Sequence, residues 1–321
     1  MRGILFAGAL FGALFPNVLR ADDLAACSLK RVTAVDMIAS ATPMAAIPIA
    51  VNGTKLQVLI DTAGILSSLS QSVVKKLDLP TSLSEEAEIM ANGQRIAQIA
   101  KVRSLQIGEM NGSDFQFLVD PVGLTGNLDG RISPDILRGY DVDFDFANNK
   151  VSFFSQDHCP GKVVYWTTAY AAIPMTLDHN GHIVIRVDLD GQTIDAVVDT
   201  GSGESMLSEA FASQAFHVSA DSAGSTRIAN APADSLVQYR HSFKAITMNG
   251  IAIRNPSLDI LPDRMEQQMR GELGKLADDP QFGLSGGEVP RLILGMDVLR
   301  QLHLYIAYKE QMLYVSGAAA H

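Results

Sequence analysis

Basic residues are in the minority in this sequence of 321 residues, and long apolar runs are almost absent. The chain carries 25 Lys and Arg against 35 Asp and Glu, a formal net charge of −10, and no run of basic residues offsets this balance. Nucleic acids and anionic membrane surfaces are bound through clustered positive charge. The composition therefore argues against both as partners.

The longest apolar run, Ile4–Phe15, follows a single Arg near the N-terminus. A run of about a dozen residues is too short to span a bilayer but has the length of a signal-peptide core. We therefore predict that residues 1–26 are a signal peptide cleaved near Ala21 or Ala26, with a buried N-terminal helix as the alternative. The mature chain is then expected to be periplasmic or secreted, without stable membrane insertion.

Cysteine is rare, with Cys27 and Cys159 as the two residues of this type. In an exported chain, a small even number of cysteines predicts a disulfide. Closing a loop of this length would stabilise the fold by about 4–5 kcal/mol on the chain-entropy model. The alternative is a lipid anchor on Cys27, because Leu24–Cys27 ("LAAC") resembles a bacterial lipobox. Charged residues separate that box from the apolar run, which favours the Cys27–Cys159 bridge.

Motifs of metal-dependent and serine hydrolases are missing. Seven histidines occur, but there is no His-Glu-x-x-His sequence and no clustered Cys/His spacing. The segment "GESMLS" contains no Gly-x-Ser-x-Gly nucleophile elbow. We therefore expect no metal and no cofactor, and interpret "DHNGH" (Asp178–His182) as a hairpin turn rather than a ligand site.

What the sequence contains instead is an internal duplication. The segment "VLIDTAGILSSLS" (Val58–Ser70) is similar to "AVVDTGSGESMLS" (Ala196–Ser208), which places two Asp-Thr steps 138 residues apart, at 61 and 199. Further on, "DILRGYDVDFDF" (Asp135–Phe146) matches "DVLRQLHLYIAY" (Asp297–Tyr308) at an offset of 162 residues, from 135 to 297. We infer two copies of one module, with insertions mainly in the second copy.

Short apolar or alternating runs between Asn-Gly and Asp-Gly turns predict an all-β fold. Short helices are expected at Ser70–Leu77, at Ser208–Phe216 and after each Asp-Ile-Leu or Asp-Val-Leu sequence. In "VDFDF", Asp143 and Asp145 alternate with phenylalanines, which predicts that both carboxylates face solvent. The segment 262–290 has no counterpart in the first copy, and its charged part is predicted to form an amphipathic helix.

The two Asp-Thr steps suggest a specific chemistry. Each carboxylate follows an apolar strand on a tight loop, and the pseudo-twofold axis of a duplicated module would bring the two together. Two carboxyl groups in close contact share one proton and titrate as a pair. The ionised member can then take a proton from water while the protonated member polarises a carbonyl. This pattern predicts amide hydrolysis without metal, Ser or Cys.

Longer motifs around these steps resemble those of a known clan. Val197–Ser202 ("VVDTGS") has the full apolar-apolar-Asp-Thr-Gly-Ser pattern, and Leu292–Gly295 ("LILG"), followed by "MDVL", supplies an apolar-apolar-Gly element. The chain thus resembles the pepsin-like and retroviral-type aspartic proteases, and looks closest to bacterial exported aspartyl-protease-family proteins. The resemblance implies two pseudo-symmetric β-barrel lobes, residues 27–157 and 158–321, with the active-site cleft between them.

The resemblance also implies roles for individual residues. Asp61 and Asp199 would form the catalytic dyad, and Thr62 and Thr200 would brace the two loops against each other by hydrogen bonds. Three further residues would shape these loops, namely Ala63, Gly201 and Ser202. Gly201 would allow the backbone to approach closely, and Ser202 would form a hydrogen bond with the outer oxygen of the carboxylate. Two hairpins would serve as flaps, at Asn92-Gly93 and at Asn230. The first copy departs from the pattern because Ala63 and Ser133 stand where glycines are expected.

We therefore expect an aspartic endopeptidase that cleaves peptide bonds in a peptide or protein substrate bound between the lobes of a monomer. One alternative is a non-catalytic module that keeps the peptide-binding site without a competent dyad. The other is a homodimeric peptidase that pairs Asp199 from two chains and uses only the C-terminal lobe.

Overall fold

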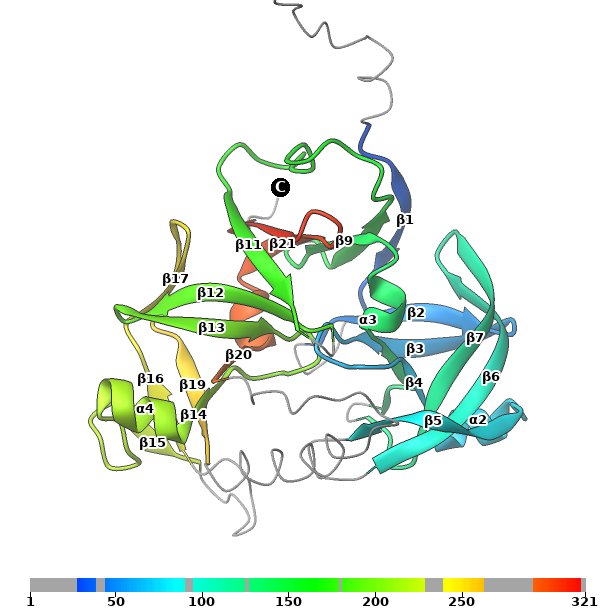
Figure 1. Ribbon diagram of the computed structural model, residues 1–321, viewed down its shortest axis with the longest axis horizontal. Helices are drawn as coiled ribbons and strands as arrows, with labels where there is room; N and C mark the ends of the chain where they lie inside the picture. The colour runs from blue at the N-terminus through cyan, green and yellow to red at the C-terminus, as the bar shows by residue number, and fades with distance from the viewer. Residues whose placement is uncertain are drawn as a thin grey trace, which may run out of the picture.

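The computed structural model describes residues 28–38, 44–89, 95–124, 127–178, 181–228, 239–262 and 291–318. Within these residues the protein is mostly β-structure with a few short helices, which confirms the all-β prediction. Figure 1 shows the blue and cyan strands of the first copy and the green and yellow strands of the second as two groups, with β9, β11 and β21 between them. The flap residues Asn92, Gly93 and Asn230, and the amphipathic helix predicted within 262–290, lie outside the described residues.

The first copy forms a seven-stranded sheet in the order β2-β3-β8-β4-β7-β6-β5. Because β2 also pairs with β6, six of these strands close into a barrel. Closure pairs the strand edges and encloses apolar side chains such as those of Val58, Ile60 and Phe117, which are fully buried. The strands are β2 (Ala46–Val51), β3 (Thr54–Ile60), β4 (Ser68–Ser70), β5 (Thr81–Ile89), β6 (Arg95–Ile107), β7 (Met110–Asp120) and β8 (Gly130–Ile132).

The second copy repeats this order as β12-β13-β20-β14-β19-β16-β15, and β12 pairs with β17 as β2 pairs with β6. Each of the long strands β6 and β7 corresponds to two shorter strands here, β16 with β17 and β18 with β19. The strands are β12 (Ile183–Leu189), β13 (Gln192–Val198), β14 (Met206–Ser208), β15 (Ser225–Arg227), β16 (Tyr239–Ser242), β17 (Ala245–Met248), β18 (Ile251–Arg254), β19 (Ser257–Leu261) and β20 (Leu292–Leu294).

A continuous antiparallel layer, β1-β10-β9-β21-β22-β11, joins the two copies. At its centre, Asp143 of β9 lies opposite Tyr305 of β21. These two residues are equivalent in the repeat, so the register is symmetric about the point where they meet. The pairing therefore relates the copies by a pseudo-twofold axis. The strands are β1 (Arg31–Asp36), β9 (Asp141–Asp145), β10 (Lys150–Phe154), β11 (Ala171–Leu177), β21 (Leu302–Ala307) and β22 (Met312–Gly317).

Two of the described helices, α2 (Gln71–Lys76) and α4 (Glu209–Phe216), occupy the predicted segments. Ser70 and Ser208 cap them, because each serine side chain accepts a hydrogen bond from a backbone N–H of the first turn.

The helices expected after the Asp-Ile-Leu and Asp-Val-Leu sequences are misplaced by one turn. These sequences lie inside α3 (Pro134–Leu137) and α6 (Met296–Leu299). Asp135 accepts hydrogen bonds from the backbone N–H and the hydroxyl of Ser67, and Asp297 accepts one from the Ser205 hydroxyl. The aspartates therefore tie the start of each helix to the segment that follows the Asp-Thr step of the same copy.

The prediction that Asp143 faces solvent is wrong, and Asp145 is half-buried. Asp143 is 1% exposed, and its oxygens lie 2.6 Å from His303 Nε2 and 2.5 Å from the Tyr165 hydroxyl. The His303 ring in turn stacks on Trp166, with ring centroids 4.0 Å apart. Alternation indicates an exposed face only where one side of a sheet meets water. Here the segment that carries Tyr165 and Trp166 covers that side and supplies polar partners.

Cys159 is not a free thiol, whereas Cys27 lies outside the described residues, so the Cys27–Cys159 bridge stays a prediction. The predicted signal peptide and the alternative lipid anchor also concern residues outside this part of the chain. Within the part that the structure describes, no helix is long and apolar enough to cross a membrane.

Candidate active site

Both Asp-Thr steps stand at the carboxyl ends of strands whose last three residues are buried, β3 and β13. Each strand pairs in parallel with a short strand, β8 in the first copy and β20 in the second. The backbone N–H of Asp61 donates to the carbonyl of Ile132 at 2.9 Å, and that of Asp199 donates to the carbonyl of Leu294 at 3.0 Å. The same backbone contact therefore holds the two aspartates at matching points of the two copies.

The two threonines join the loops to each other. The Thr62 hydroxyl donates to the carbonyl of Val198 at 2.7 Å and accepts from the backbone N–H of Thr200 at 3.0 Å. The Thr200 hydroxyl donates to the carbonyl of Ile60 at 2.6 Å and accepts from the backbone N–H of Thr62 at 3.2 Å. Both threonines are fully buried. Water cannot compete for these bonds, so they fix the spacing of the two loops.

The second loop holds its carboxylate with backbone donors. Asp199 Oδ1 accepts from the N–H groups of Gly201 at 2.8 Å and of Ser202 at 3.1 Å. The Ser202 hydroxyl donates to the carbonyl of Glu204 at 2.7 Å, and not to the outer oxygen of Asp199 as predicted. The carbonyl of Glu204 faces the hydroxyl across the turn, which explains the difference.

The two carboxylates lie on either side of Gly201. In the first loop, Asp61 Oδ1 accepts from the N–H of Ala63 at 3.1 Å. A methyl group built on Gly201 would lie 2.5 Å from Asp61 Oδ1 and 3.1 Å from Asp199 Oδ1. The two oxygens can be no further apart than the sum of these distances, which equals the span of two O–H···O hydrogen bonds. One bridging water therefore suffices to join the two carboxylates.

The electrostatics of the pair favour a proton on Asp199. Burial, followed by the negative charge of Asp61, raises the pKa of Asp199 to about 7. The N–H groups of Gly201 and Ser202 and the charge of His182 act in the opposite direction and only partly offset this rise. Asp199 therefore holds its proton up to neutral pH.

Two family models match the chain, one in each copy. Residues 185–298 match the model described as aspartyl protease, and residues 47–130 match the model described as gag-polyprotein putative aspartyl protease. Each matched range contains one of the Asp-Thr loops. The chain belongs to an aspartic protease-type family. No curated protein matches its sequence.

A solved structure shares the fold of this aspartic protease-type chain. It is the crystal structure of basic 7S globulin from soybean, which superimposes with a TM-score of 0.52 over 91% of this chain and 96% of that one. The two sequences are 10% identical, so the likeness shows the fold alone. It extends across both copies, in agreement with the pepsin-like arrangement.

Ser133, one of the two residues of the first copy that depart from the aspartic protease pattern, lies against Gly64. A methyl group on Gly64 would lie 2.4 Å from the hydroxyl oxygen of Ser133. In the second copy the equivalent residues are Ser202 and Gly295, and a methyl group on Gly295 would lie 2.4 Å from a backbone oxygen. In the first copy the glycine stands at 64 and the serine at 133, whereas in the second copy the serine stands at 202 and the glycine at 295. The glycine missing at Ser133 is compensated by a glycine at 64, so the first loop keeps its packing.

Arg131 is a site residue that the sequence reasoning missed. Its Nη1 lies 3.5 Å from Asp61 Oδ2, and both side chains are about nine-tenths buried. Arg131 occupies the position of Ile293 in the second copy, because it pairs with Leu59 as Ile293 pairs with Val197. The alignment of "GRIS" with "LILG" carries the signal, since a charged residue replaces an apolar one in the strand beside the Asp-Thr loop.

His182 is the second missed residue. As predicted for "DHNGH", the segment connects two antiparallel strands, β11 and β12. Its histidine, however, is not a passive turn residue. The Nδ1 atom lies 2.9 Å from Asp178 Oδ2, and the charges of Asp199 and Asp61 both act on the imidazole.

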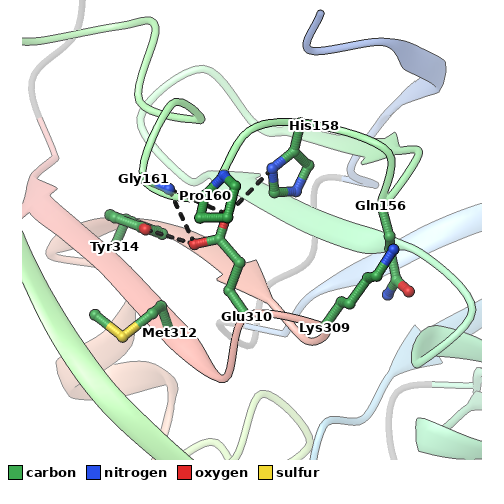
Figure 2. A pocket seen from close by; sticks show the side chains of 8 residues that line it. All are labelled: Gln156, His158, Pro160, Gly161, Lys309, Glu310, Met312 and Tyr314. Carbon is green, nitrogen blue, oxygen red and sulfur yellow. Dashed lines mark hydrogen bonds and ion pairs between the residues drawn. The ribbon is translucent and has the colours of Figure 1, made fainter. Parts of the chain in front are cut away.

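Outside the Asp-Thr loops, a cavity of about 610 Å³ lies beside the β21–β22 hairpin (Figure 2). The Glu310 carboxylate that projects into it accepts from the Tyr314 hydroxyl at 2.7 Å and lies 3.1 Å from His158 Nδ1. Its charged group is thus already paired within the protein, and no residue of either Asp-Thr loop lines the cavity. Among the described residues, no three His, Cys, Asp or Glu side chains converge as metal ligands.

Proposed function

We propose that the protein is an aspartic endopeptidase in which Asp61 and Asp199 together activate one water molecule. The observation that carries this proposal is the buried cross-link of Thr62 and Thr200, which joins the two loops while both carboxylates lie close to Gly201. Because the cross-link forms within one chain, it also favours a single-chain site over a homodimer of second copies.

The two carboxyl groups would have different roles. Asp61, with the Arg131 guanidinium beside it, is the ionised member and takes a proton from the bound water. The oxygen of that water forms a bond to the peptide carbon, and the proton of Asp199 passes to the carbonyl oxygen. The C–N bond of the resulting gem-diol then breaks while the proton held by Asp61 goes to the leaving nitrogen and one gem-diol hydroxyl returns its proton to Asp199. One water is consumed, and the dyad returns to its starting protonation.

A peptide-binding module without catalysis is the second candidate, and Arg131 is the observation that favours it. A guanidinium 3.5 Å from Asp61 Oδ2 offsets the negative charge of the carboxylate that would take a proton from the water. If this ion pair kept Asp61 from accepting that proton, the site would bind extended peptides without cleaving them.

The test is cleavage of a fluorogenic peptide library from acidic to mildly alkaline pH by the wild type and by two single variants, Asp61→Asn and Asp199→Asn. Both variants should fold, since Asn is nearly isosteric with Asp, and both should lose cleavage because neither carboxylate can serve as acid and base together. Asp195→Asn, an exposed residue of the same strand β13, is the matched control and should retain activity.

Three outcomes separate the candidates. Loss of cleavage in both variants supports the single-chain peptidase. Full activity of Asp61→Asn with loss in Asp199→Asn would favour the homodimer of second copies. A folded wild type that binds peptides but cleaves none of them at any pH would support the peptide-binding module.

A further inference from the structure

The register of β12 and β13, continued past the last paired residues, leads to His182 and Asp199. In this antiparallel pair, Ile185 lies opposite Ala196 and Val184 lies opposite Val197. Continuing the same register by two residues sets His182 opposite Asp199. Residues opposite each other in an antiparallel pair have Cα atoms about 4.5–5.5 Å apart and side chains on the same face. The imidazole therefore projects on the face that carries the Asp199 carboxyl group.

A set of hydrogen bonds fixes the orientation of this imidazole. Asp178 accepts from the backbone N–H of His182 through one oxygen and contacts Nδ1 through the other, both at 2.9 Å. With Nδ1 directed at Asp178, Nε2 points away from it. Nε2 is buried, and no described group forms a hydrogen bond with it. A buried polar nitrogen without a partner, next to a catalytic loop, is available to the reacting groups.

The turn that carries His182 also rests on the first copy. A methyl group on Gly181 would lie 3.5 Å from Pro134 and 3.5 Å from Arg138 Nη1, both in the α3 region. The strand before α3 is β8, which carries Arg131. The turn therefore sits where the two copies meet.

The basic neighbours of the two carboxylates do not follow the pseudo-twofold axis. In the first copy the register of β2 and β3 places Met44, not a histidine, opposite Asp61. In the second copy Ile293 stands in place of Arg131. Each carboxylate thus has one basic neighbour, and the two neighbours come from unrelated positions. Such an arrangement does not follow from the duplication and requires an explanation from chemistry.

On the proposed function, we propose that His182 is a third ionisable group of the active site. Its imidazolium charge, held beside Asp199 by Asp178, sets the upper pH limit at which the Asp61–Asp199 pair keeps its shared proton. His182 is a positioning residue in this scheme, because it acts through Asp199 and not on the peptide bond.

The electrostatic balance agrees with this geometry. Burial works to lower the pKa of His182, but the hydrogen bond and charge of Asp178, together with the charges of Asp199 and Asp61, outweigh burial and raise the pKa above its ordinary value. Among the described residues, Arg138 also brings a charge to the turn, on the side of Gly181. The raised pKa favours the imidazolium form of His182, and the positive charge of that form favours ionisation of Asp199.

The experiment replaces His182 by neutral Gln and by charged Lys in the full chain and measures the pH profile of kcat/KM. His182→Gln removes a positive charge near Asp199, so Asp199 should keep its proton to higher pH. The alkaline limb of the profile should then move to higher pH by about one unit, so that kcat/KM at a pH on that limb rises about tenfold. His182→Lys should return the limb to the wild-type position or below it. His241→Gln, at a half-buried histidine bonded to Ser225, is the matched control and should leave the limb unchanged.

A second readout does not depend on cleavage. In protein labelled with carbon-13 at the Asp carboxyl carbons, the Asp199 signal, assigned by its absence in Asp199→Asn, should titrate at higher pH in His182→Gln than in the wild type. An unchanged Asp199 titration would overturn the role of His182, even if the dyad variants prove the peptidase. A shifted titration in a protein without peptidase activity would support His182 while removing the proposed function.

Discussion

Gly201 offers the sharpest test of where the two carboxylates lie. A methyl group at this position would be 2.5 Å from Asp61 Oδ1 and 2.6 Å from Asp61 Cγ. Ordinary C···O contacts are about 3.3–3.6 Å, so in Gly201→Ala the Asp61 carboxylate must move by about 1 Å. It cannot do so without weakening its bond from the Ala63 N–H and its contact with Arg131.

The expected effect on catalysis is larger than the effect on folding. A displacement of about 1 Å in a catalytic group lowers the rate by about 100-fold, or about 2.7 kcal/mol of transition-state stabilisation. Overpacking of this kind costs about 1–3 kcal/mol of folding free energy, and the lower end applies because the group that moves is the end of a side chain.

The assay is kcat/KM for one cleaved peptide, together with urea denaturation of the same preparations. Ala63→Gly is the matched control, since Ala63 is the equivalent residue of the first copy. It should keep kcat/KM within a few-fold and lose about 0.4–1 kcal/mol of stability through the entropy of the unfolded chain. A Gly201→Ala protein with wild-type kcat/KM would refute the reasoning, because Asp61 could not then be a reacting group beside Gly201.

Three further predictions concern the buried polar groups. Thr200→Val leaves the carbonyl of Ile60 without its buried donor. It should lower the free energy of unfolding by about 2–4 kcal/mol in urea denaturation. Ser202→Ala, which loses only a hydrogen bond at the surface, is the control. Asp143→Leu removes the partner of buried His303 and should lower the free energy of unfolding by about 3–5 kcal/mol, measured as a lower Tm. An unchanged Tm would mean that the pair contributes nothing to stability. The pKa of Asp199 is raised by burial and by Asp61 from 3.8 to about 7, so its contribution to stability is full below pH 3.8 and is lost as the pH rises through 7. Asp199→Asn should therefore raise Tm relative to wild type more at mildly alkaline pH than at acid pH, and a constant difference would contradict the shift.

The predictable part of the fold is the part encoded in short stretches. An apolar strand followed by Asp-Thr, and a serine that caps a helix, each determine their structure within a few residues. The short apolar runs between Asn-Gly and Asp-Gly turns predicted the all-β fold. The internal repeat predicted two related copies, and their pseudo-twofold relation is visible where Asp143 pairs with Tyr305.

The features that escaped prediction depend on what packs against a strand from elsewhere in the chain. Asp143 alternates with phenylalanines as an exposed residue would, but the segment that carries Tyr165 and Trp166 covers it. His182 precedes a strand in an ordinary turn, and only the register of β12 and β13, continued by two residues, leads from it to Asp199. Arg131 was within reach of the sequence, because aligning the two copies places it against Ile293.

The asymmetry of these neighbours gives a reason for keeping both copies in one chain. Two carboxyl groups in contact share one proton even when they are identical, but unlike neighbours decide which of the two holds it. A homodimer of either copy would place the same residue beside both aspartates, Arg131 twice or His182 twice. Only a duplicated chain can place the guanidinium beside Asp61 and the imidazole beside Asp199. On the proposed function, the different basic neighbours of the two copies, Arg131 and His182, are then part of the mechanism.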